Sequence, residues 1–178
     1  SIYGLVIIII SMVQFITTPV QTTISTYVFE KYDNKEFNIL KEFMKNFSQL
    51  FLVFLILCGI FLNAVSPLIV LIIASSEFME VISILPFMIF GLFTFIFSVN
   101  INWAYQMREK MYEYFIRNIF ATIISIIVLI ILLPKYGLIG AAISYMINYI
   151  LAFIFLFKRS FELFYYDFQI RKKIKLIF

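Results

Sequence analysis

Residues 119–133 read IFATIISIIVLIILL, and only Thr122 and Ser125 in this run carry polar side chains. The run belongs to a longer apolar stretch at about 112–133, and about 20 such residues let an α-helix cross a hydrocarbon layer of roughly 30 Å. Four more apolar stretches lie at about 3–28, 50–73, 81–105 and 138–157. The sequence therefore predicts an all-α, multi-pass membrane protein with about five transmembrane helices.

The overall composition favours the same fold class. Of the 178 residues, 63% are hydrophobic and only 13% are charged. A soluble helical protein of this length needs a far larger share of charged residues to cover its surface. The composition therefore argues against a soluble protein with buried cores.

The basic residues alternate between the connections that join these stretches. The odd-numbered connections and the C-terminal end carry thirteen of the fourteen: Lys31, Lys35, Lys41, Lys45, Arg108, Lys110, Arg117, Lys158, Arg159, Arg171, Lys172, Lys173 and Lys175. The even-numbered connections carry only Lys135, and the one around Ser75-Ser76-Glu77 carries none. Lys and Arg beside transmembrane helices stay in the cytoplasm. The N-terminus is therefore predicted outside and the C-terminus in the cytoplasm.

The chain divides into a transmembrane bundle, 1–157, and a C-terminal tail, 158–178. The tail is rich in aromatic and basic residues, which favour the membrane interface. We expect it to lie at the cytoplasmic surface, with a solvated, disordered tail as the alternative. The chain also begins with Ser1 and has no signal-peptide pattern. We therefore expect it to be the C-terminal portion of a longer protein, whose N-terminal half is then its partner.

The residue types argue against catalysis. Histidine is absent, and Cys58 is the single cysteine, so the commonest general base, the commonest metal ligand and any internal disulfide are missing. We predict no catalytic residues, no metal site and no cofactor, and hence a protein that is not an enzyme. The net charge of +4 lies in residues that flank apolar stretches, which indicates contact with membrane lipid and not with nucleic acid.

Two stretches carry polar residues at helical spacing. The first stretch has Ser11, Gln14, Thr18, Gln21 and Ser25, and the third has Gly91, Thr94, Ser98, Asn102 and Gln106. Polar side chains inside a membrane face protein or a water-filled cavity. These stripes are therefore candidates to line a cavity that opens to the cytoplasm, or to join one helix to another.

Single polar residues in the other stretches have two readings each. Arg117 lies about five residues into the fourth stretch, so it either reaches the level of the polar stripes or extends to the lipid headgroups. Asn63 and Asn148 are expected to donate hydrogen bonds between helices, with a role as substrate ligands as the alternative.

Two connections have patterns of their own. Phe37, Leu40, Met44 and Phe47 recur at spacings of three, four and three, which predicts an amphipathic connector along the inner membrane surface. Between the fourth and fifth stretches, Pro134 is expected to stop a helix and Gly137 to allow a tight turn. The small residues that follow the turn are expected to let another helix approach closely; they are Gly140, Ala141 and Ser144.

The segment 132–144, LLPKYGLIGAAIS, resembles the C-terminal IPKYGxxGAAxA signature of polysaccharide flippases of the Wzx type. These proteins belong to the multidrug, oligosaccharidyl-lipid and polysaccharide exporter superfamily. Pro67-Leu68-Ile69, Ser76-Glu77-Phe78 and Ile84-Leu85-Pro86 are similar to the preceding helix pair of that family. The resemblance covers about 66–150 and extends weakly to the whole chain.

The resemblance implies a twelve-helix protein of two six-helix bundles with alternating access, in which this chain supplies helices eight to twelve of the second bundle. The cargo would be an undecaprenyl-pyrophosphate-linked oligosaccharide for O-antigen or teichoic-acid type polysaccharides, flipped across the bacterial inner membrane. Basic residues face the central cavity in such proteins, and Arg117 is the candidate here.

Three other functions stay open. A multidrug or cation exporter of the same superfamily is expected to carry acidic residues deep inside its spans, whereas the one acidic residue within these stretches, Glu113, lies near the cytoplasmic surface. A glycan polymerase or glycosyltransferase is expected to have a large external loop, whereas the even-numbered connections are short. A purely structural membrane subunit is the last alternative.

Overall fold

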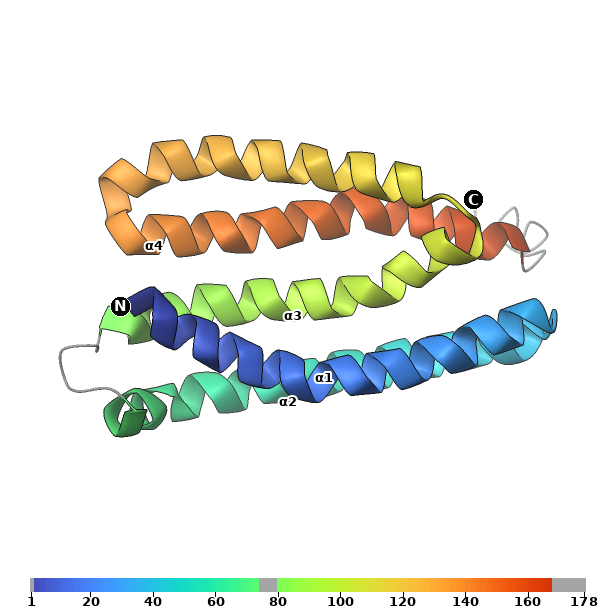
Figure 1. Cartoon of the computed structure of the whole chain (residues 1–178), viewed down its shortest axis with the longest axis horizontal. Helices are drawn as coiled ribbons and strands as arrows, with labels where there is room; N and C mark the ends of the chain where they lie inside the picture. Colours follow the sequence, from blue (N-terminus) through green and yellow to red (C-terminus); the bar gives the residue numbers. More distant parts are fainter. Residues whose placement is uncertain (1, 74–79, 168–178) are drawn as a thin grey trace, which may run out of the picture.

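The computed structural model of the chain describes residues 2–73 and 80–167, and these residues form only helices and short connections. The helices are α1 (Ile2–Asp33), α2 (Phe37–Ile73), α3 (Glu80–Met107) and α4 (Met111–Asp167). Figure 1 shows them as long rods whose direction alternates along the chain. The predicted all-α class is confirmed for the part of the chain that the structure describes.

The connections α1–α2 and α3–α4 are tight turns of the same type. Lys35 and Glu109 have φ values of 60° and 54°, and each donates its N–H to the carbonyl three residues earlier, Tyr32 at 3.0 Å and Gln106 at 3.1 Å. The next N–H, from Glu36 in the first turn, reaches back five residues. This is the Schellman pattern, which satisfies the last carbonyls of a helix.

Helix α4 reverses direction at Gly137, whose φ of 54° and ψ of −130° are not helical. The first arm (111–136) and the second arm (138–167) lie antiparallel (Figure 1). Pro134 was predicted to stop the fourth helix, but the helix runs through it. The φ of proline suits a helix, whereas a positive φ favours a residue without a Cβ atom, so the chain turns at the glycine.

Helix α3 is the centre of the bundle and packs against all three other helices. Its buried residues, among them Leu85 and Leu92, form one cluster with Phe51 and Leu55 of α2 and with Ala142 of the second arm of α4. A Cβ atom on Gly91 would lie 2.9 Å from the Tyr145 ring and 3.1 Å from Met146 Cα. The glycine therefore allows close approach of α3 to α4.

The predicted connector, Phe37–Phe47, is not a separate helix. It forms the first turns of α2, which continues without a break to Ile73. Leu40 and Met44 are buried against Val28 of α1 and Trp103 of α3. The apolar side of this amphipathic segment is covered by protein, which explains why it joins the bundle instead of forming an element of its own.

Helix α4 continues past residue 157 to Asp167, so the first part of the predicted tail is helical. The predicted division into a transmembrane bundle and a cytoplasmic tail stays a prediction. The rest of the predicted tail, 168–178, and the predicted external connection at Ser75-Ser76-Glu77 lie outside the described residues.

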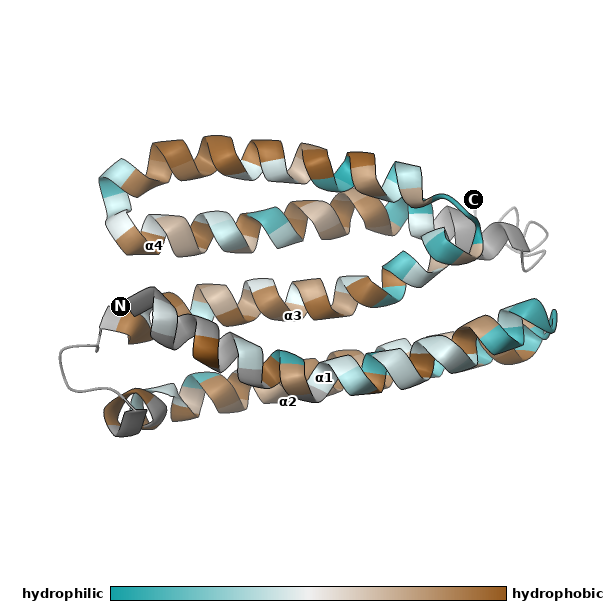
Figure 2. Cartoon of the chain, viewed as in Figure 1, coloured by the Kyte–Doolittle hydropathy of each residue, from teal (hydrophilic) through white to brown (hydrophobic). Residues whose placement is uncertain are grey.

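Three helices of the described chain are long and apolar enough to cross a membrane: Phe37–Leu68, Val81–Met107 and Met111–Ser160. Large apolar side chains are exposed along α2 and the first arm of α4, including Phe54, Leu57, Ile126 and Ile130. Figure 2 shows this arm as almost continuously hydrophobic. These faces suit contact with lipid chains, while the predicted count of five crossings and their orientation stay predictions.

Candidate functional site

Helix α1 presents a polar strip that the other helices leave partly uncovered. Of the predicted stripe, Ser11 and Thr18 are exposed, and Gln14, Gln21 and Ser25 are half-buried. Thr22, Thr23 and Thr26 are exposed as well. We call the polar side chains of this segment the polar strip: Ser11, Gln14, Thr18, Gln21, Thr22, Thr23, Ser25 and Thr26. The apolar residues Phe15 and Val20 are exposed beside them, at 82% and 45%. Figure 2 shows the middle and C-terminal parts of α1 paler and more hydrophilic than the first arm of α4.

The hydroxyl groups of the polar strip are bonded within α1. Thr22 donates to the Thr18 carbonyl at 3.0 Å, Thr26 to the Thr22 carbonyl at 3.1 Å and Thr23 to the Pro19 carbonyl at 3.0 Å. Each hydroxyl oxygen keeps its acceptor capacity, because donation uses only the O–H. These three threonine hydroxyls thus form a row of acceptors that depends on no other helix.

Gln21 is the member of the stripe that joins two helices. Its Nε2 donates to the Ile96 carbonyl of α3 at 2.9 Å. This residue therefore holds α1 against α3, which is the second of the two roles predicted for the stripe.

Of the stripe predicted on α3, Thr94 lies in a groove apart from the polar strip. Thr94 donates to Phe90 O at 2.9 Å and lines a groove that contains no α1 residue. Ser98 is buried and donates to Thr94 O at 2.6 Å, and Asn102 is half-buried with Oδ1 unbonded. The structure therefore does not bring Thr94 into a shared cavity with α1.

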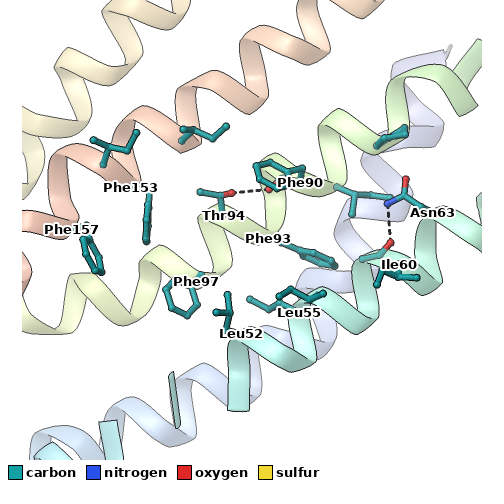
Figure 3. A pocket seen from close by; sticks show the side chains of 16 residues that line it. Leu52, Leu55, Ile60, Asn63, Phe90, Phe93, Thr94, Phe97, Phe153 and Phe157 are labelled. Atoms are coloured by element: carbon teal, nitrogen blue, oxygen red, sulfur yellow. Dashed lines mark hydrogen bonds between the residues drawn. The ribbon is translucent and has the colours of Figure 1, made fainter. Parts of the chain in front are cut away.

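The groove beside Thr94 has a volume of about 1160 Å³ and lies between α2, α3 and the second arm of α4 (Figure 3). All lining residues are apolar except Thr94 and Asn63. Asn63 Nδ2 donates to Gly59 O of its own helix at 2.8 Å, so it is not the interhelical donor that was predicted. The groove suits an apolar occupant.

The small residues after the α4 turn hold its two arms together. A Cβ atom on Gly140 would lie 2.5 Å from the Leu132 carbonyl oxygen. Buried Ser125 donates to the Ser144 carbonyl at 2.8 Å, and Ser144 donates to Gly140 O, also at 2.8 Å. Ala141 is half-buried next to this contact.

Arg117 lies on the first arm of α4, and its Nη1 donates to the Phe155 carbonyl of the second arm at 3.0 Å. It lines a groove of about 480 Å³ whose lining residues all belong to α4. This groove therefore contains no residue of the polar strip, and the predicted level of Arg117 in the membrane stays a prediction.

Ionisable residues give no sign of a metal site: within 2–73 and 80–167, no three His, Cys, Asp or Glu residues are grouped to hold an ion.

Comparisons with known protein families, with curated proteins and with solved structures find no match.

The sequence patterns did not predict one buried amide, Asn100. Asn100 is only 5% exposed, and neither its Oδ1 nor its Nδ2 has a hydrogen-bond partner. It lies one turn beyond Ile96 and one turn before Trp103, on the side of α3 that packs against α1 and α2. The predicted stripe ran through Ser98 and Asn102, so Asn100 lay outside its helical spacing. The available signal was an amide with an apolar residue on each side, Val99 and Ile101.

Proposed function

We propose that this chain is a five-crossing part of a transporter in the bacterial inner membrane, which moves a lipid-linked oligosaccharide across the bilayer by alternating access. In this proposal α1, α2, α3 and the two arms of α4 each cross once. The cargo follows from the sequence resemblance, and the membrane placement from the apolar faces of the helices.

The ends of the rods support the proposed orientation. The turns at 34–36 and 108–110 and the C-terminal end of α4 lie at one end of the bundle, and the turn at Gly137 lies at the other (Figure 1). The first end carries Lys31 and Lys110 among its basic residues, whereas Lys135 lies at the other. In the proposal the end with more Lys and Arg faces the cytoplasm.

A single observation carries the proposed transport role: the polar strip of α1 is left uncovered on a bundle whose α2 and α4 faces are apolar. A polar face is costly against lipid chains, so it has to meet water or another part of the protein. Its hydroxyl and amide groups match the hydroxyl groups of sugars in hydrogen-bonding capacity. In the proposal, another part of the transporter encloses the strip from the other side.

The strip also favours a glycan over a cationic drug. Residues 11–26 contain no Asp or Glu, whereas a cation site inside a membrane needs a carboxylate to balance the charge. The neutral strip instead offers many weak acceptors and donors, as a sugar chain requires.

Cysteine labelling tests whether the strip meets water. In a Cys58→Ala background, Thr18→Cys and Thr22→Cys in the assembled protein should react with a charged, water-soluble maleimide. The matched control, Val53→Cys, is an exposed residue on the apolar face of α2 and should stay unlabelled. Equal labelling of Val53→Cys and Thr18→Cys would remove the basis for a water-lined strip.

A complementation assay tests the cargo. Thr18→Leu with Ser11→Leu should abolish export of surface polysaccharide at unchanged protein level, because both residues are exposed and neither side chain bonds another helix. Normal export by this variant would contradict the proposed role of the strip.

A further inference from the structure

The groove beside Arg117 combines a cation with apolar walls on one side of the α4 hairpin. Tyr112 and Glu113 lie at its start, and Phe120, Ile124 and Phe155 extend it along the two arms. Phe120 and Ile124 are exposed, at 58% and 37%. The groove therefore presents polar groups at one end and hydrocarbon along the rest, as a lipid does.

The charges at the polar end do not cancel. Glu113 accepts from Arg159 Nε at 3.0 Å, and Lys110 Nζ lies 3.6 Å from the same carboxylate. With Arg117 added, the group holds three cations and one carboxylate. A net positive site at the end of a transmembrane helix attracts anionic lipid headgroups.

Arg117 is held at a defined depth. It lies six residues after Met111, which is about 9 Å along the helix axis. Its bond to Phe155 O directs Nη1 across the hairpin to the second arm. The remaining N–H groups of the guanidinium fork can bind phosphate oxygens, for which that geometry is suited.

We propose that this groove binds an anionic phospholipid, with the phosphate at Arg117 and an acyl chain along Phe120 and Ile124. The inference rests on the membrane placement proposed above and not on the cargo. A free phosphate would use the cation but leave the apolar walls unoccupied, so a lipid phosphate fits the whole groove better.

Quenching of an introduced fluorophore tests the site in the full-length protein. Tyr112→Trp places an indole at the polar end, and the unsubstituted protein gives the background from Trp103, which is 3% exposed. Dibrominated phosphatidylglycerol should quench the Tyr112→Trp signal at a lower mole fraction than dibrominated phosphatidylcholine, by about fivefold or more if one cation contributes about 1 kcal/mol. Equal quenching by the two lipids would overturn the proposal.

Charge variants then identify the residue. Arg117→Gln should remove the preference for phosphatidylglycerol, and Arg117→Lys should keep part of it. The control Lys135→Gln, at the opposite end of the bundle, should leave it unchanged. A preference that survives Arg117→Gln would refute the assignment.

Two further measurements keep the test decisive. If Arg117→Gln does not fold, Glu113→Gln should strengthen the preference because it raises the net charge, and a weaker preference would count against the site. Inorganic phosphate at millimolar concentration should not displace the lipid; displacement would identify a free-anion site instead. If these tests fail, the lipid site is refuted but the proposed function is not, because the export assay measures that function separately.

Discussion

The substitution Gly140→Ala adds only one methyl group but should destabilise the α4 hairpin strongly. The new Cβ atom would lie 2.5 Å from Leu132 O and 2.7 Å from Leu132 C, and both are backbone atoms. Ordinary contact begins at 3.4 Å, so the two arms have to separate by about 1 Å near the turn, an overpacking that costs about 1–3 kcal/mol. The same movement weakens the Ser125–Ser144 bond, at about 0.6 kcal/mol for an interhelical hydrogen bond in a membrane.

We therefore expect the free energy of unfolding to fall by about 2 kcal/mol, close to a thirtyfold change in the unfolding equilibrium. Unfolding of the purified protein by sodium dodecyl sulfate in mixed micelles, followed by circular dichroism, measures this value. Gly59→Ala is the matched control, because its Cβ atom would meet only the Phe93 ring, at 3.0 Å, and a side chain can move aside. Equal stability of both variants would refute the argument that backbone contact holds the hairpin closed.

Three other substitutions test single contacts by the same unfolding assay. Asn100→Leu should raise the free energy of unfolding by about 1 kcal/mol, since it removes a buried amide that has no partner; a loss of stability would show that Asn100 is bonded. Gln21→Leu should lower the free energy of unfolding by about 0.6 kcal/mol, because the α1–α3 hydrogen bond is lost. Gln14→Leu, the control, should lower it by less. Gly137→Ala should lower the free energy of unfolding by about 1–3 kcal/mol, because φ 54° with ψ −130° is a conformation that favours glycine; no change would mean that the turn relaxes without strain.

The sequence predicted the helical class and most of the helix positions, because an apolar run longer than a bilayer crossing has few other stable structures. The turn at Gly137 was predicted for the same kind of reason, since a positive φ favours glycine. The predicted helix end at Pro134 was wrong, because proline is compatible with helical φ and the chain turns three residues later, at Gly137.

The site was harder to predict, because the periodicity of a helix shows which residues share a face and not what covers that face. Gln21 and Thr18 belong to one stripe, yet Gln21 bonds α3 and Thr18 is exposed. The same limit applies to Arg117, whose partner is the Phe155 carbonyl. Every residue has a backbone carbonyl, so the sequence does not show which carbonyl on the other arm accepts the bond.

The placement of the bundle across a membrane can be measured directly with two cysteines. In the Cys58→Ala background, Lys35→Cys and Lys135→Cys lie at opposite ends of the rods, and an impermeant maleimide is added to intact cells and to inverted membrane vesicles. The proposal predicts that Lys135→Cys reacts in cells and Lys35→Cys only in inverted vesicles. Labelling of both positions from the same side would contradict it.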